Sequence, residues 1–215
     1  MQTPITKQKF QDHIHYSWWK YAALAIIAFV FWSITYTMTA YRPPEEKRVL
    51  MGVYAYGQDA TARAYMEQVR LTFMPEMEQV EPMYMTPDAS YGPIILMTRV
   101  AAGDCDIYVL PAAEFQSWAD QGSCQALDEM APGLLSDLEA AGISLSRGRR
   151  EVNGEKHIYG IPCRDLPAAD LVFGAETEDM YICVFHNTGN DEYVFRFLDI
   201  LVHDLMTEPT TAPAA

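Results

Sequence analysis

The stretch 99-RVAAGDCDIYVL-110 decides the fold, because it ends in an apolar run that turn residues enclose on both sides. Residues 105–110 read CDIYVL, with Gly103 shortly before them and Pro111 directly after them. Short apolar runs bounded by Gly and Pro are typical of strands buried on both faces of a sheet. We therefore predict a strand at residues 105–110 in the interior of a sheet.

Helices are predicted on either side of this strand. Residues 93–102 begin with a proline, which suits the first turn of a helix, and Gly103 follows as a C-terminal stop. Residues 113–121 place three large or small apolar side chains on one side at helical spacing, and Gly122 ends the pattern. The stretch and its surroundings thus predict the order helix, strand, helix.

The residues before this stretch repeat the same order of strand and helix. Residues 49–56, VLMGVYAY, and residues 80–85 predict two further apolar strands. A helix that starts at the N-cap residue Asp59 connects them, with apolar residues at helical spacing until Pro75. Three strand–helix units in succession favour an α/β lobe with a mostly parallel sheet flanked by helices, which we expect to span residues 49–206.

The residues after this stretch extend the lobe. Residues 132–142 predict a helix, and the Asn-Gly pair at 153–154 predicts a hairpin turn that leads into a strand at residues 157–163. Residues 179–186 predict the last strand, and a final helix follows the Asn-Asp pair at 190–191. These elements continue the same α/β arrangement to the end of the domain.

A long apolar segment precedes the lobe. Between Lys20 and Arg42 lie 21 residues without a charge, YAALAIIAFVFWSITYTMTAY, enough to span a hydrocarbon core of about 30 Å as a helix. Tyr and Trp residues gather at both ends, as they do at the two interfaces of a bilayer. We expect a cytoplasmic tail at residues 1–17, a transmembrane helix at 18–41, a Pro-containing charged stalk at 42–48 and a disordered tail at 207–215.

A cleaved signal peptide is the alternative interpretation of this segment. It would need an apolar region of about 7–15 residues and a small-x-small cleavage site. The run here is longer, and residues 37–40 place Met where a small residue belongs. The basic residues on the two flanks are equal in number, so they do not decide which side of the membrane the lobe occupies. We expect an uncleaved anchor in the lipid bilayer.

The lobe is strongly acidic. Nine of the 15 Lys and Arg residues and 26 of the 29 Asp and Glu residues lie after Arg48, which gives this part of the chain a net charge of −17 with His neutral. Such a surface repels nucleic acids and anionic lipid headgroups. No nucleic-acid partner is therefore expected, and solubility explains the charge.

Three segments match, in order, motifs of one known family. Residues 99–128 contain a helix, the pattern A-x-G-x-x-D before a strand, a second helix and a Leu-Asp pair. Residues 153–162 read NGEKHIYGIP, similar to a G-K-x-Y-G-I-P hairpin, and residues 185–198 are similar to a segment that returns the chain to a first lobe. The chain thereby resembles the extracellular solute-binding proteins of bacterial ABC importers. The resemblance implies an α/β lobe outside the cytoplasm.

The chain departs from this family in one respect. In the family, the segment between the Y-G-I-P strand and the return strand builds most of a second lobe, and the ligand is enclosed between the two lobes. Residues 165–178 offer only 14 residues here, enough for a loop or a turn of helix. The plan of a short aromatic-rich tail, one membrane helix and a single lobe also resembles uncharacterised membrane-anchored proteins of Firmicutes.

Candidate binding residues lie where the predicted parallel strands end. Ligands of open α/β sheets bind beyond the carboxyl ends of the strands. Aromatic rings and polar groups at those ends suit sugars, peptides or polyamines, although ordinary loop residues above a core are the alternative. The candidates are Tyr56, Gln58, Tyr91, Glu114 and Phe115, with Arg164 as a candidate contact for an anionic ligand or a partner.

Catalytic, cofactor and metal sites are not expected. The sequence shows no nucleophile paired with a base and no Cys or His spacing typical of a metal site, and His157 and His186 on predicted strands are interpreted as structural or surface residues. The four cysteines are either buried free thiols or partners in disulfides. The candidate disulfide pairs are Cys163 with Cys183 and Cys105 with Cys124.

Together these observations favour a non-enzymatic function. We expect a membrane-anchored, extracytoplasmic domain that binds a protein partner or, weakly, a small solute. The apolar face that a missing lobe leaves would be covered by self-association or by a membrane-protein partner. Two other functions stay open: an envelope enzyme whose site a partner completes, in which His157 or His186 would be essential, and a structural subunit of a membrane complex.

Overall fold

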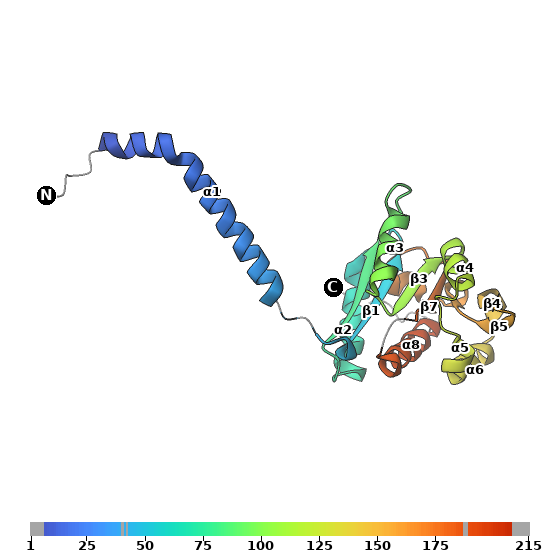
Figure 1. Ribbon diagram of the computed structural model, residues 1–215. Coiled ribbons are helices and arrows are strands. Elements are labelled where there is room, and N and C mark those ends of the chain that lie inside the picture. The colour runs from blue at the N-terminus through green and yellow to red at the C-terminus, as the bar shows by residue number, and fades with distance from the viewer. Residues whose placement is uncertain (1–6, 40, 42, 187–188, 208–215) are drawn as a thin grey trace. The chain divides into compact units, whose positions relative to one another are not determined.

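The computed structural model describes residues 7–39, 41, 43–186 and 189–207 (Figure 1). The chain divides into two compact units, residues 1–42 and residues 43–215, which are described separately. The tail predicted at residues 207–215 lies outside the described residues except for Thr207, and so do the first six residues of the tail predicted at 1–17.

The first unit contains one long helix, α1 (Lys7–Thr39). Its segment Trp18–Thr39 has 22 residues, a mean hydropathy of 1.7 and no buried residue. The hydroxyls of Thr35, Thr37 and Thr39 donate to carbonyl oxygens four residues earlier, at 2.7–2.9 Å. The segment is therefore long and apolar enough to cross a membrane, and these three hydroxyls are satisfied within the helix.

The second unit is built on a five-stranded sheet of order β2-β1-β3-β7-β6. β1 pairs in parallel with β2 and β3, whereas β7 runs antiparallel to both β3 and β6. Four of the five strands thus share one direction, and the predicted α/β lobe with a mostly parallel sheet is confirmed. The strands are β1 (Arg48–Tyr54), β2 (Gln79–Met85), β3 (Ile107–Pro111), β6 (Ile161–Pro162) and β7 (Met180–Val184).

Helices cover both faces of the sheet, because the strands are apolar on both sides. Val49, Met51 and Val53 of β1 face one core, which α2 and α8 cover. Leu50 and Tyr54 face the other core, which α3 and α4 cover. The helices of this unit are α2 (Asp59–Phe73), α3 (Gly92–Ala102), α4 (Ala112–Asp120), α5 (Leu127–Met130), α6 (Pro132–Ala140), α7 (Ala169–Phe173) and α8 (Asp191–Met206), and the short 3-10 turns are η1 (Glu45–Lys47), η2 (Leu145–Gly148) and η3 (Cys163–Asp165).

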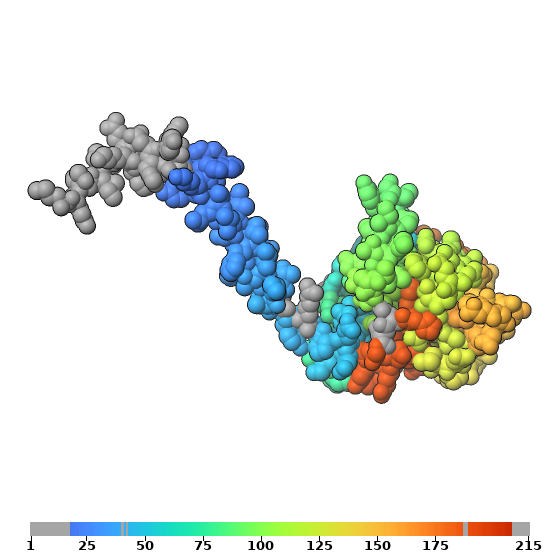
Figure 2. Space-filling model, viewed as in Figure 1, coloured from blue at the N-terminus to red at the C-terminus, as the bar shows by residue number. Residues whose placement is uncertain are grey.

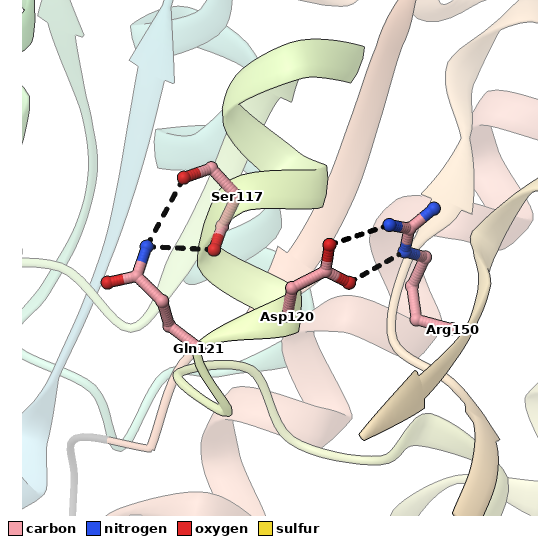
Figure 3. A network of polar contacts seen from close by, with 4 residues as sticks. All are labelled: Ser117, Asp120, Gln121 and Arg150. Carbon is pink, nitrogen blue, oxygen red and sulfur yellow. Dashed lines mark hydrogen bonds and ion pairs between the residues drawn. The ribbon is translucent and has the colours of Figure 1, made fainter. Parts of the chain in front are cut away.

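A hairpin of β4 (Arg149–Val152) and β5 (Glu155–Ile158) forms a separate two-stranded sheet. The Asn-Gly pair at 153–154 has φ angles of 54° and 88°, as the predicted hairpin turn requires. Figure 3 shows how the hairpin is held to α4: Arg150 donates two bonds of 3.0 and 2.7 Å to Asp120, beside the bonds from Gln121 to Ser117. Because Arg150 donates to its carboxylate, the pKa of Asp120 lies below its usual value.

The prediction of one continuous strand at residues 157–163 is wrong. The structure divides it into β5 and β6, and Tyr159 and Gly160 lie between them. Gly160 packs directly against the backbone of Gly148 and against the ring of Phe115, and the amide of Tyr159 donates to the carbonyl of Gly148 at 3.0 Å. This close backbone approach, which no local pattern encodes, interrupts the strand.

The remaining predicted strands and long helices are found, with ends that differ by a few residues. Asp59, predicted as an N-cap, is instead the first residue of α2. The short helix α5 was not expected, and α7 is the turn of helix allowed for in residues 165–178. Gly103 ends α3 in the left-handed conformation, with φ of 66°, as a C-terminal glycine stop does.

The point where the chain enters the domain is bound to the last helix. Asn190, which is buried at the start of α8, donates its side-chain amide to the carbonyl oxygens of Arg48 at 2.9 Å and Glu45 at 3.3 Å. Buried amides of this kind hold two backbone segments together because leaving the carbonyls unpaired would be costly. The start of β1 is therefore fixed to the N-terminus of α8.

All four cysteines are buried and none of them forms a disulfide, so neither candidate disulfide pair is bonded. Cys183 instead neighbours Cys124: burial first, and then the hydrogen bond with Cys124, raise the pKa of Cys183. Burial also raises the pKa of Cys105 to about 12 and that of Cys163 still further. Enclosed thiols are poor nucleophiles, so the cysteines act as core residues.

Candidate ligand-binding site

A cavity of about 530 Å³ lies at the edge of the sheet where the parallel strands end. β1, β2 and β3 share one direction, so their carboxyl ends meet at this edge. β7 runs the other way, which brings the start of β7 and the loop before it to the same place. The cavity is lined by Tyr54, Ala55, Tyr56, Pro87, Pro111, Arg164, Glu176, Glu178, Asp179 and Met180.

Tyr54, the last residue of β1, is the most enclosed polar side chain of the cavity. It is only 4% exposed, and no described residue forms a hydrogen bond with its hydroxyl. The hydroxyl lies against Gly92, where a Cβ atom would come within 2.5 Å of the oxygen. Burial first, and then the negative charge of Glu114, raises the pKa of Tyr54. A neutral hydroxyl without a protein partner is thus presented to whatever fills the cavity.

Tyr56 forms a wall at the mouth of the cavity. Its side chain is 69% exposed, and its hydroxyl donates to the carbonyl oxygen of Pro87 at 3.3 Å. This bond joins the loop after β1 to the loop after β2, so the ring stands between two strand ends. An exposed aromatic ring held in this way offers a face on which a ligand can stack.

The acidic wall of the cavity comes from the connection between α7 and β7, which is firmly anchored. Asp170 accepts bonds from the amide and the hydroxyl of Thr177 at 2.8 and 2.6 Å. The amide of Gln58 donates to Gly174 at 3.1 Å, and the hydroxyl of Tyr84 donates to the carbonyl of Phe173. The carboxylates that follow are therefore presented by a fixed loop.

The charges in the cavity do not balance. Arg164 lies 3.6 Å from Glu178, with both side chains at least half exposed. Glu176 and Asp179 have no ion pair among the described residues. The described residues also contain no cluster of three or more His, Cys, Asp or Glu side chains that could hold a metal ion. The cavity therefore carries an excess of negative charge without the geometry of a metal site.

The structure brings together some of the residues proposed from the sequence. Tyr56 and Arg164 line the cavity, and Glu114 lies close enough to act on Tyr54. Gln58 and Tyr91 lie on the loops after β1 and β2 but do not line the cavity.

Phe115 is placed elsewhere. It lies in the first turn of α4, where it is fully buried and stacks on Tyr181, with ring centroids 4.6 Å apart and an interplanar angle of 10°. It belongs to the core beneath the site.

Four lining residues are not among the candidates predicted from the sequence: Tyr54 and the acidic loop residues Glu176, Glu178 and Asp179. Tyr54 was assigned to the interior of the first strand, because that strand was predicted to continue to residue 56, whereas β1 ends at Tyr54. The sequence 176-ETED-179 does show three carboxylates next to an apolar strand. Only the antiparallel pairing of β7 shows that this acidic run reaches the ends of the parallel strands.

The histidines proposed for the alternative enzyme lie away from this cavity. His157 lies 3.1 Å from Asp128, and a carboxylate of Glu155 approaches its other ring nitrogen at 3.6 Å. The bond with Asp128 raises the pKa of His157, which favours the charged ring over the neutral form that a general base needs. His186 is exposed.

Comparison with known proteins gives partial structural matches only. No family model matches the chain, and no curated protein does. Among solved structures, the extracellular solute-binding protein family 1 from Alicyclobacillus acidocaldarius subsp. acidocaldarius DSM 446 aligns with a TM-score of 0.41 and 19% identity, over 56% of this chain and 29% of that one. Maltose-bound MalE3 of T. maritima aligns with a TM-score of 0.37 and 18% identity, over 60% of this chain and 34% of that one. The N-glycan transport solute-binding protein NgtS from Streptococcus pneumoniae aligns with a TM-score of 0.36 and 16% identity, over 54% of this chain and 24% of that one.

These alignments cover only part of each chain. The chain is similar to extracellular solute-binding proteins over about half its own length, and it spans about a third or less of the length of each of them. The chemistry of the site rests on the residues described above.

Proposed function

We propose that this protein is a membrane-anchored, non-enzymatic binding domain whose cavity at the strand ends receives a small solute. The observation that carries this proposal is the cavity itself: about 530 Å³, beside an exposed aromatic ring and the hydroxyl of the enclosed Tyr54, which has no hydrogen bond among the described residues. Concave sites with a few convergent polar groups are the usual place for small ligands. Among the described residues, the surrounding carboxylates are not paired with a nucleophile or a base, which favours binding over catalysis.

The anchor is the helix Trp18–Thr39, with the domain outside the cytoplasm as in the proteins that the fold resembles. Its support is the length and hydropathy of the segment, its exposed side chains and its internally bonded hydroxyls. A protein contact near the membrane, either with a second copy or with a membrane protein, is a further part of the proposal. It is supported by the start of α3, which stands out from the domain surface (green in Figure 2) and exposes Tyr91, Ile94 and Met97.

The anchor predicts how the protein fractionates. The full-length chain should stay with membranes after washing with alkaline carbonate and should be released by mild detergent, because 22 apolar residues hold it in the bilayer. Protease added to intact cells should cut the acidic domain. Release by carbonate, or a domain left intact while other surface proteins are cut, would contradict the anchor or its orientation.

The binding role predicts the effect of removing one hydroxyl. Tyr54→Phe breaks no hydrogen bond among the described residues, so the variant should unfold at the same temperature as the wild type. If the hydroxyl contacts a ligand, its loss should weaken binding about threefold to tenfold, the value of one hydrogen bond. The measurement is calorimetric titration of the full-length chain in detergent with maltotriose, trialanine and spermidine as probes.

Tyr193→Phe serves as the matched control, because Tyr193 lies on α8 and does not line the cavity. It should bind every probe as the wild type does. The proposal fails if none of the three probes binds the wild type, or if the probe that binds has the same affinity for Tyr54→Phe.

A further inference from the structure

The cavity contains carboxylates that the protein does not neutralise. Glu176 and Asp179 line it without an ion pair among the described residues, while the one lining cation, Arg164, lies 3.6 Å from Glu178. The field extends inward, because Glu114 and Asp88 both act on Tyr54 as negative charges. An anionic ligand would therefore meet repulsion, and a cation would supply the missing charge.

A single metal ion does not match this arrangement. Hard cations require several oxygen ligands converging within about 2.6 Å. No group of three or more suitable side chains converges in this way among the described residues. The negative charge is distributed along one wall, which suits a ligand whose positive charges are also separated.

The uncharged surfaces of the cavity match the rest of such a ligand. Tyr56 presents an exposed ring at the mouth, and aromatic faces attract organic ammonium groups. Pro87, Pro111 and Met180 supply apolar contact for methylene groups. The hydroxyl of Tyr54, which has no hydrogen bond among the described residues, can accept one from an ammonium group in the cavity.

We propose that the solute is an aliphatic polyamine, a chain of methylene groups carrying two or more ammonium groups. The ammonium groups contact Glu176 and Asp179, the methylene groups lie along the apolar lining, and Tyr56 covers the mouth. This inference rests on the proposed function, since it names the class of ligand for the same cavity.

The test is calorimetric titration of the full-length chain in detergent with spermidine, at low and at moderate salt. The pocket variant is the double substitution Glu176→Gln with Asp179→Asn. Glu178 is left unchanged because its loss would free Arg164. The control is Glu139→Gln with Glu192→Gln, which removes the same amount of charge. Both carboxylates are exposed, neither lines this cavity, and neither forms an ion pair among the described residues.

Spermidine should bind the wild type, and the pocket variant should bind it about tenfold more weakly, because two charge contacts are lost. The control variant should change the affinity less than twofold. Equal weakening by both variants would show general attraction to an acidic protein and would overturn the inference. Binding of maltotriose without binding of spermidine would overturn the polyamine while leaving the proposed function standing. If neither probe binds, nor trialanine, both proposals fail.

Discussion

Gly148→Ala is expected to destabilise the domain by more than about 3 kcal/mol, beyond the usual cost of overpacking. A Cβ atom at this position would lie 1.8 Å from the carbonyl oxygen of Gly160. Gly160 cannot move away, because its own Cα packs on the ring of Phe115, which in turn stacks on Tyr181. The added methyl group therefore has to separate β6 from the core.

The measurement is urea unfolding of the full-length chain in detergent, followed by circular dichroism. Gly133→Ala is the matched control: nothing lies within 4 Å of its Cβ position in α6, so alanine should be neutral or stabilise by about 0.5–1 kcal/mol. A Gly148→Ala variant within about 1 kcal/mol of the wild type would show that the contact between the two glycines is not as close as described.

Asp106→Asn is expected to stabilise the protein at neutral pH by up to about 3 kcal/mol. Asp106 is 6% exposed and accepts a hydrogen bond from the amide of Leu50 at 2.8 Å. Burial raises the pKa of Asp106 to about 6, although the bond from Leu50 opposes the shift. Because the folded protein binds this proton more tightly than the unfolded chain does, stability is greatest below about pH 4 and falls as the pH rises through about 6.

Asparagine keeps an oxygen for the amide of Leu50 and carries no charge to desolvate. The gain should therefore be large at pH 8 and absent at pH 4, when urea unfolding is measured at both values. Asp120→Asn is expected to have the opposite effect and to destabilise the protein at neutral pH. The hydrogen bond from Arg150 lowers the pKa of Asp120, so the charged carboxylate stabilises the folded protein. A loss of stability in Asp106→Asn at pH 8, or an equal gain at both pH values, would contradict the role of burial.

The sheet could be predicted from the sequence because its signals are local. β1 and β3 are apolar on both faces. Gly103 marks the end of α3 and Pro111 marks the end of β3. The interruption after β5 could not be predicted, because it depends on contact between Gly148 and Gly160, which are distant in sequence.

The candidate site was predicted in position but only partly in composition. Tyr56 could be predicted to line the site because it follows the end of a parallel strand, and its place depends on strand direction alone. Phe115 follows the same strand end, yet its place in the first turn of α4 directs it into the core. The carboxylates at residues 176–179 reach the cavity through the long-range pairing of β7 with β3, and sequence periodicity does not reveal such a pairing.

The direction of β1 has a mechanical consequence. The chain enters the domain at the start of this strand, where Asn190 holds the backbone, and the cavity opens at its other end beside Tyr54. Tension applied between these two ends would therefore act along the axis of β1. The ladders to β2 and β3 would resist it in shear, with many hydrogen bonds loaded at once instead of opening one after another.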